Sequence, residues 1–370
     1  MKVICNRDDL LQAVRTVQNA LTSTALPVLS HVLILAKEKG GEVIATNLES
    51  TIYSNFEADV EEEGNICLPG VKLFSILREL PPGQLSLETR DSEGLIKMEQ
   101  IFFSLLGLPG EDFPETPAPL KPVFTLPQQV LRMIFEKTMF SAGQDEVRQN
   151  LNCVFLETTF PEQKATAILK AVATDGRRLS LLTVSDLQIS EPFQILIPLR
   201  AVRELTKILE KEGEVKVGVE QNRVFFQTHN FSFFSQLIDA RFPDYQGVIP
   251  RDYRISFKAK REELMAAIRR VSLLTEQQTR LVKFTLKGDS LLINTTSARL
   301  GSAYQELSVL TEQKEEIEIG FNATFLLEAL RIMEEDLVEV HLIDNESPGV
   351  FQPVESQNYL YILMPVKLRD

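Results

Sequence analysis

Few residues of this 370-residue chain have the types and spacing that catalysis or metal binding requires. The only histidines, His31, His229 and His341, are scattered and lack the HExxH or similar spacing of a zinc site. The sequence also lacks a glycine-rich phosphate loop and a nucleophile elbow. Asp175, in an Ala-Thr-Asp-Gly segment, fits an Asx-type turn better than a catalytic role. The sequence therefore gives little support to an enzyme, and no cofactor or metal is expected.

The three cysteines, Cys5, Cys67 and Cys153, lie far apart and each among apolar residues. This pattern predicts buried free thiols, not a disulfide framework or a metal site. The first residues turn polar too early for a secretory signal, and no apolar run approaches the roughly 18 residues of a membrane span. We therefore expect a cytoplasmic protein with no membrane contact.

One set of cations has spacing that suits phosphate binding. Arg200, Arg203, Lys207 and Lys211 follow one another at intervals of three, four and four residues, which predicts a shared helix face. Such a face can contact DNA phosphates without reading base sequence. A solvated face with i,i+4 partners such as Glu204 is the alternative, and this helix alone does not distinguish the two.

The distribution of charge matters more than its total. The net charge of −13 by itself argues against nucleic acid as a partner. Six predicted helices nevertheless carry 15 Lys or Arg against 11 Asp or Glu, and they span residues 7–21, 71–80, 127–141, 199–212, 260–275 and 322–334. A ring accounts for both facts, because basic helices would line the hole while the acidic outer surface repels non-productive DNA contact.

The elements that must position these helices recur three times along the chain. Each copy begins with an apolar strand that runs into an amphipathic helix, at Val3, Val123 and Ile255. Each continues with a strand, a small or polar turn and another strand, and later with a strand, a second helix and a further strand. The starts are 120 and 132 residues apart, which is the size of a domain.

Two equivalent linkers separate the copies. Residues 113–122 and 242–251 are rich in proline or turn residues, and both contain a Phe-Pro-acidic triplet. We therefore predict domains at 1–120, 121–250 and 251–370. Each reads as two helices packed on antiparallel sheet, an α+β class.

Three segments carry a family resemblance: ATDGRRL at 173–179, RFPDY at 241–245 and MPVKL at 364–368. In this order, and with the threefold plan, the chain resembles the bacterial DNA polymerase III beta subunit, the sliding clamp, over essentially its whole length. The resemblance implies a head-to-tail homodimer whose six clamp domains form a ring around double-stranded DNA. It also implies a non-catalytic processivity factor that tethers the replicative DNA polymerase.

The resemblance further implies a groove between the central and C-terminal domains for a short linear motif of polymerases, the clamp loader and repair proteins. Carried over residue by residue, it consists of Leu151, Thr174, Gly176, Arg178, Leu179, Pro243, Val248, Ile362, Met364, Pro365 and Val366. The apolar end of the chain supports this interpretation, because terminal residues are usually polar. A buried terminal strand is the alternative before Met364, but Pro365 does not suit a regular central strand. For residues 174–179 a plain hairpin turn is the alternative.

The predicted ring assigns residues to DNA, and the resemblance assigns residues to ring closure. The expected DNA-facing cations are Arg15, Lys72, Arg78, Arg132, Lys137, Arg148, Arg200, Arg203, Lys207, Lys211 and Arg269. The expected dimer contact joins Leu273 and Leu274 of one copy to Phe103 and Leu105 of the other, although adjacent leucines are equally compatible with an ordinary core.

The chain departs from the family pattern at four places. Asn150 stands where some relatives have an aromatic residue, and Gly247 where some have a basic one. The loop 22–25 lacks an arginine that some clamps present to DNA, and residues 369–370 extend beyond the usual terminal leucine. A threefold scaffold that binds proteins but never DNA remains the rival class. It shares the groove and the fold, and only ring closure and retention on circular duplex separate the two.

Overall fold

The computed structural model describes residues 1–370 except 23–25, 146, 162–165, 251, 313–314 and 369–370. Part of the loop 22–25 and the extension 369–370 therefore lie outside the described residues. The chain packs into two compact units. Unit 1 comprises residues 1–132, 188–191 and 200–237, and unit 2 comprises 133–187, 192–199 and 238–370. The central repeat thus contributes to both units.

Unit 1 contains two antiparallel sheets. The five-stranded sheet has the order β5-β1-β7-β8-β9 and the eight-stranded sheet the order β10-β15-β16-β17-β4-β3-β2-β6. The strands are β1 (Lys2–Asn6), β2 (His31–Lys37), β3 (Gly40–Thr46), β4 (Ser50–Phe56), β5 (Ala58–Glu62), β6 (Gly64–Pro69), β7 (Gln84–Arg90), β8 (Glu93–Met98), β9 (Ile101–Leu106), β10 (Phe124–Pro127), β15 (Glu214–Glu220), β16 (Arg223–Gln227) and β17 (Phe231–Gln236).

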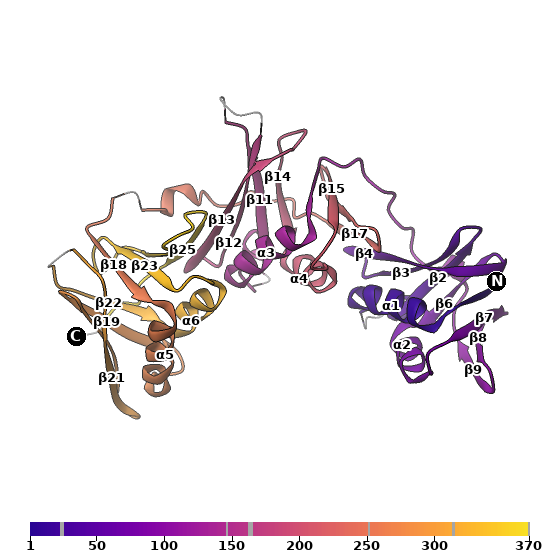
Figure 1. Ribbon diagram of the computed structural model, residues 1–370, viewed down its shortest axis with the longest axis horizontal. Coiled ribbons are helices and arrows are strands. Elements are labelled where there is room, and N and C mark those ends of the chain that lie inside the picture. Colours follow the sequence, from indigo (N-terminus) through magenta and orange to yellow (C-terminus); the bar gives the residue numbers. More distant parts are fainter. Residues whose placement is uncertain (23–25, 146, 162–165, 251, 313–314, 369–370) are drawn as a thin grey trace. The chain divides into compact units, whose positions relative to one another are not determined.

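The helices of unit 1 are α1 (Arg7–Val17), α2 (Gly70–Glu79) and most of α4 (Leu199–Ile208). Helix α3 (Gln128–Thr138) begins in unit 1 and ends in unit 2. Helix α1 lies beside α2 and packs against β3 and β4 (Figure 1). Its start is set by the Asn6 side chain, which accepts a hydrogen bond of 2.9 Å from the Asp8 N–H. The buried residues Leu10, Val14 and Val17 form the apolar stripe that the sequence predicts.

Unit 2 also contains two antiparallel sheets, with the orders β14-β11-β12-β13-β25-β24-β23-β18 and β21-β20-β19-β22. The strands are β11 (Cys153–Thr159), β12 (Ala167–Thr174), β13 (Arg178–Leu187), β14 (Gln194–Pro198), β18 (Ile255–Lys260), β19 (Leu281–Lys287), β20 (Ser290–Ser297), β21 (Gly301–Ser308), β22 (Ile317–Asn322), β23 (Leu337–Leu342), β24 (Gly349–Pro353) and β25 (Tyr359–Leu363). Helix α5 (Arg261–Val271) lies beside α6 (Ala323–Ile332).

Short 3-10 turns complete the chain. They are η1 (Gln18–Ala20), η2 (Pro27–Ser30), η3 (Gly110–Asp112), η4 (Met139–Ser141), η5 (Gln149–Leu151), η6 (Gln246–Val248) and η7 (Ser272–Leu274). Three of them, η1, η4 and η7, follow directly on α1, α3 and α5. The first helix of each repeat therefore ends in the same way.

Each eight-stranded sheet is shared by two repeats. In unit 1, β4 of the first repeat pairs antiparallel with β17 of the second, with Ser50 opposite Ser235. In unit 2, β13 of the second repeat pairs antiparallel with β25 of the third, with Arg178 opposite Leu363. The corresponding outer strands β9 and β21 each lie at the edge of their sheet.

The predicted α+β class and the threefold repetition of elements are confirmed. The six predicted helices are present, but the helix predicted at 199–212 ends at Ile208. The prediction that Lys211 shares a helix face with Arg200, Arg203 and Lys207 is therefore wrong. The Gln128 side chain accepts from the Glu210 N–H at 3.0 Å and donates to the Glu212 carbonyl at 3.0 Å. These bonds hold the chain just beyond the helix in a non-helical path. The exact domain boundaries remain a prediction.

The thiol prediction is confirmed: Cys5, Cys67 and Cys153 are free and buried. Burial raises the pKa of each thiol to about 12. Within the described residues, no group of His, Cys, Asp and Glu is arranged to hold a metal ion. Across the same part of the chain, no helix has the length and apolar character to span a membrane.

Candidate peptide groove and cationic helices

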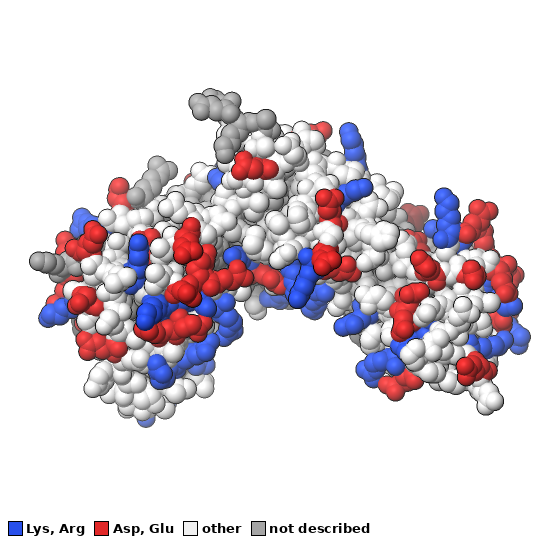
Figure 2. Space-filling model, in the orientation of Figure 1, with Lys and Arg blue, Asp and Glu red and all other residues white. Residues whose placement is uncertain are grey.

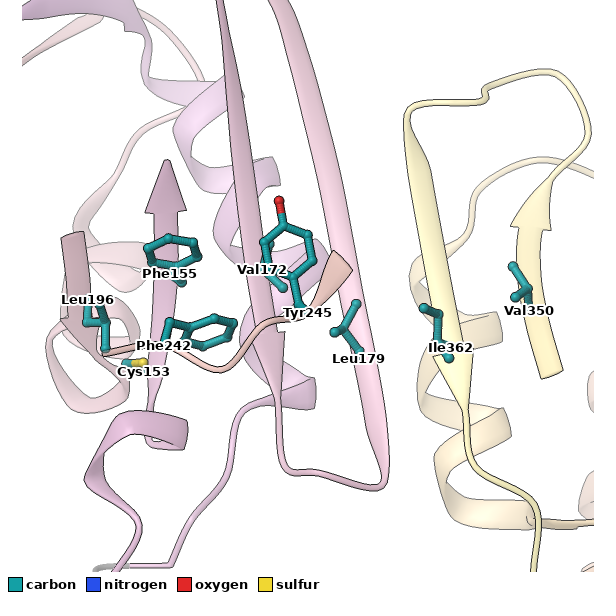
Figure 3. Close-up of a cluster of buried hydrophobic side chains, with 9 residues drawn as sticks. All are labelled: Cys153, Phe155, Val172, Leu179, Leu196, Phe242, Tyr245, Val350 and Ile362. Atoms are coloured by element: carbon teal, nitrogen blue, oxygen red, sulfur yellow. The ribbon is translucent and has the colours of Figure 1, made fainter. Parts of the chain in front are cut away.

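One face of the large sheet in unit 2 carries an apolar cluster that the connecting segment 238–249 covers. The cluster consists of Cys153, Phe155, Val172, Leu179, Leu196, Phe242, Tyr245, Val350 and Ile362 (Figure 3). Leu179 on β13 lies directly opposite Ile362 on β25. The cluster therefore spans the strand pair that joins the second repeat to the third.

Two aromatic residues hold the connecting segment on this face. The ring of Phe242 stacks on that of Phe155, with centroids 4.7 Å apart. Tyr245 meets Phe155 edge to face, and its hydroxyl donates to the carboxylate of the buried Glu157. Burial and this carboxylate raise the pKa of Tyr245, which keeps the phenol protonated. The aromatic residues of the Arg-Phe-Pro-Asp-Tyr segment thus fix the path of the chain.

The predicted groove residues around this cluster differ in exposure. Leu179 and Ile362 are buried, Pro243 is exposed, and Val248 and Met364 have exposed fractions of 49% and 43%. Single exposed apolar side chains are common, so the location of Val248 and Met364 beside the apolar cluster is the informative feature. The cluster, the exposed Met364 and the connecting segment together make this face the strongest candidate for peptide binding.

The chain end after β25 is held by its backbone. The Met364 N–H donates to the Arg177 carbonyl at 2.8 Å, and the Val366 N–H donates to the Gly320 carbonyl at 2.8 Å. Pro365 lies between them outside any strand, which fits the expectation that it does not continue a ladder. Pro365 and Val366 are half-buried.

The turn 174–178 adopts the predicted Asx geometry. Asp175 Oδ1 accepts from the N–H groups of Arg177 and Arg178 at 2.9 and 3.1 Å. The Thr174 hydroxyl donates to the Arg178 carbonyl at 2.6 Å and accepts from the Gly176 N–H at 3.0 Å. Gly176 has φ +86°, a conformation that favours glycine. Thr174 and Gly176 therefore shape the turn through these contacts.

Arg178 lies on the other face of the sheet from Leu179, because neighbours in a strand alternate. Its guanidinium donates to Asp175 at 3.0 Å, to the Phe140 carbonyl at 2.7 Å and to Glu328 on α6. It also lies 4.1 Å from the ring centre of Phe325. Burial acts to lower the pKa of Arg178. The hydrogen bond to Glu328 and the charges around the guanidinium raise the pKa by more than burial lowers it, so the net change is upward. The side chain joins the second repeat to the third from the helix side, and its predicted role in the groove remains a prediction.

Leu151 is buried in η5, next to the connecting segment. The Asn150 side chain donates to the Arg241 carbonyl at 3.3 Å, and the Leu151 carbonyl accepts from the Gly143 N–H at 2.8 Å. Asn150 therefore ties η5 to the residue that precedes Phe242. Gly247 is exposed in η6.

The predicted DNA-facing cations fall into two sets. One set lies exposed on helices and consists of Arg15, Lys72, Arg78, Arg203, Lys207 and Arg269, of which Arg78 is close to Glu79. The cations of the other set form ion pairs with nearby carboxylates, lie outside the α-helices, or lie on α3. Arg200 pairs with Glu204 at 2.9 Å, Lys137 approaches Glu334 at 3.9 Å, Arg148 approaches Asp145 at 3.7 Å, and Lys211 follows α4. Arg132 lies on α3. Figure 2 shows separate groups of Lys and Arg with Asp and Glu between them.

An open cavity of about 950 Å³ in unit 1 brings together basic residues that lie far apart in the sequence. Its lining includes Arg15 on α1, Lys207 on α4, and also Lys39 and His229 from two hairpin tips. The acidic side chains of Asp9, Glu57 and Glu210 share the lining. Sequence reasoning missed Lys39 and His229, because neither has a basic neighbourhood along the chain.

The predicted dimer residues lie at two places. Phe103 and Leu105 are half-buried on the edge strand β9, while η7 holds the half-buried Leu274 and Leu273, which is 79% exposed. Four further large side chains are exposed on the edge strands: Ile101, Phe102 and Leu106 on β9 and Tyr304 on β21. Sequence reasoning missed them, because alternation along a strand does not reveal which strand ends a sheet.

Comparison with known proteins assigns all three repeats to one family. Residues 1–117, 125–244 and 246–367 match the family models of the N-terminal, central and C-terminal domains of the DNA polymerase III beta subunit. The beta sliding clamps of Pseudomonas putida and Proteus mirabilis are 30% and 31% identical, with full coverage of both chains.

Solved structures agree with this assignment. The DNA polymerase III subunit beta of Pseudomonas aeruginosa superimposes with a TM-score of 0.93 at 29% identity, and a form bound to griselimycin with 0.94 at 29%. The beta subunit of Thermotoga maritima gives 0.91 at 27%. In each case both chains are covered completely.

Proposed function

The chain belongs to the DNA polymerase III beta subunit family, and on this premise we propose that two copies close head to tail into a ring around double-stranded DNA. The ring is a sliding clamp that keeps a replicative DNA polymerase on its template. It works in the cytoplasm, where it encircles the DNA and tethers the polymerase, and the bound polymerase catalyses DNA synthesis. Its direct partners are the duplex, a second copy, the polymerase, the clamp loader and other proteins with the same short linear motif.

The repeated strand pairing carries this proposal. Twice within the chain, the strand after the hairpin turn pairs with the last strand of the next repeat, as β4 does with β17 and β13 with β25. The third such strand, β21, and the last strand of the first repeat, β9, are both sheet edges. Edge strands offer backbone groups to another chain. A head-to-tail contact of β21 with β9 repeats the in-chain pairing, and two such contacts close the dimer.

Exposed apolar side chains support the same contact. Phe102 and Leu106 on β9 and Tyr304 on β21 are solvent-exposed in the single chain. Leu273 and Leu274 add to the surface of the third repeat, and Phe103 and Leu105 to that of the first. Burial of such side chains favours association.

The exposed helix cations suit a duplex that moves. Lys and Arg side chains neutralise phosphates without fixing a register on the bases, so the protein can slide. Mixed signs of charge keep the contacts weak, and the closed ring, not affinity, prevents loss from DNA. Arg203 on α4 is one leading contact. Lys207 on α4 and Arg15 on α1 are two more, and they line the cavity that Lys39 and His229 share.

The apolar face of unit 2 suits a short peptide. Leu179 and Ile362 are buried in the cluster beneath it, and the exposed Met364 and Val248 can pack on an incoming side chain. The unbranched thioether of Met364 adapts to partners of different shape. Griselimycin binds a relative of this chain, and we expect the groove to accept such a ligand here.

Primer extension on a long primed circular template tests the proposed function. With a matched loader and polymerase, the protein should lengthen the products of a single binding event. Met364→Asp should shorten them again, whereas Leu48→Asp, at a residue of similar exposure in unit 1, should not. If the wild-type protein leaves product length unchanged while a control clamp lengthens it, the proposed function is wrong.

A further inference from the structure

The two junctions between repeats share one polar device. In unit 1 the carboxylate of Glu204, only 5% exposed, accepts hydrogen bonds from the Ser50 hydroxyl at 2.6 Å and the Asn47 amide at 3.4 Å. In unit 2 the carboxylate of Glu328 accepts from the Arg178 guanidinium. In both cases an acid on the second helix of one repeat binds the hairpin turn of the repeat before it. We call this contact the polar latch.

The acids occupy the same position in the repeat. The second helices begin at Gly70, Leu199 and Ala323, each directly after a strand. Their first, fourth and eighth residues are buried in all three helices. In this alignment Glu204 and Glu328 are both the sixth residue of their helix.

The donors also correspond. The first hairpin turn closes between Thr46 and Thr51, and the second between Thr174 and Leu179. Ser50 and Arg178 are therefore both the last residue of a four-residue turn. The acid and its donor thus occur together at both in-chain junctions.

The third set of elements lacks both halves of the latch. The sixth residue of α2 is Ser75. The third hairpin turn closes between Ser297 and Gly301 and has three residues in place of four, and its last residue, Leu300, is 53% exposed. The helix face that is buried in α4 and α6 is also more exposed in α2. At its seventh position Leu205 and Ala329 are buried, whereas Ile76 is half-buried. The hairpin turn of the third repeat and the second helix of the first repeat are therefore more exposed than the corresponding surfaces at the two junctions within the chain.

From this correspondence we infer that Leu300 of one copy docks on Ser75 and Ile76 of a second copy, an apolar contact that replaces the polar latch. The inference rests on the proposed head-to-tail dimer. The junction between copies then forms without a buried ion pair or carboxylate. Because it lacks the polar latch, it can separate while both junctions within the chain stay closed.

The latch also selects which surfaces meet. A leucine that docks against Glu204 removes the Ser50 and Asn47 donors from a carboxylate that is 5% exposed and leaves it only Arg200. A leucine that docks against Glu328 removes its Arg178 partner. Both losses are unfavourable, and the loss at the more buried Glu204 is the larger. Ser75 carries no charge and tolerates Leu300. The acid therefore excludes the wrong pairing, and the serine permits the right one.

Subunit exchange tests this inference. Copies labelled with donor and acceptor fluorophores are mixed, and the rate of appearance of energy transfer gives the exchange rate. Ser75→Glu alone should speed exchange, because it places an acid against Leu300. Ser75→Glu combined with Leu300→Arg recreates the pairing of Glu328 with Arg178 and should exchange about tenfold more slowly than the two single changes predict when added.

The matched control is Val71→Glu combined with Leu300→Arg, because Val71 holds the second helix position, which is exposed in all three repeats. It carries the same charges and should show no coupling. Additive effects of Ser75→Glu and Leu300→Arg in a wild-type background that is dimeric by sedimentation would overturn the latch inference alone. A wild-type protein that stays monomeric at all concentrations would overturn the proposed dimer and the inference together.

Discussion

Arg178 should stabilise the joint between the second and third repeats. Its side chain is only 8% exposed and donates to Asp175, to the Phe140 carbonyl and to Glu328. Arg178→Met keeps much of the aliphatic contact with Phe325 but removes all three donors. Loss of one member of a fully buried pair costs about 3–5 kcal/mol.

The expected loss here is smaller, because water can reach the groups that remain. The side chain of Glu328 is 37% exposed and that of Asp175 is 19% exposed. Asp175 also keeps its two backbone donors. We therefore expect the free energy of unfolding to fall by about 2–3 kcal/mol.

Urea unfolding monitored by circular dichroism measures this change. The matched control is Arg177→Met at the exposed neighbouring position, which should cost less than about 0.5 kcal/mol. If Arg178→Met costs no more than this control, the guanidinium does not hold the repeats together, and the reasoning is wrong.

Three further predictions concern the thiols, the dimer and DNA. Burial raises the pKa of Cys5, Cys67 and Cys153 to about 12, so the native thiols should resist Ellman's reagent at pH 8 and all react after unfolding. Their contribution to stability is complete below the unfolded thiol pKa of roughly 8.5 and is lost as pH rises toward 12, and a fast native reaction would contradict this. Leu273→Asp should weaken the dimer at least about tenfold in sedimentation, since it places a charge in an apolar contact, without changing the monomer's circular dichroism. Lys207→Glu should lower low-salt binding to linear duplex in fluorescence anisotropy, whereas Lys287→Glu, on β19, should change it less.

Local patterns allowed the elements to be predicted. Apolar periodicity places α1 because Leu10, Val14 and Val17 lie close in sequence and share a face. The end of α4 could not be predicted in this way, because it depends on Gln128, about eighty residues earlier in the chain. A local pattern therefore overestimates a helix whose last turn is stopped by a distant side chain.

The candidate groove was predicted as a set of residues, but not as a geometry. The family resemblance carries both Arg178 and Leu179 to the groove, while strand alternation places them on opposite faces of the sheet. That alternation was available in the sequence. The approach of Glu204 to Asn47 was not, because it depends on the pairing of two repeats.

Retention on nicked circular DNA tests the central claim most directly. The protein is loaded by a matched clamp loader, and half of the DNA is then cut once with a restriction enzyme. The ring account predicts that the protein stays on circles at high salt and leaves the cut molecules by sliding off their ends. Equal, salt-sensitive retention on both forms would contradict topological binding, and no retention on either form, with a control clamp loaded in parallel, would favour a scaffold that binds proteins only.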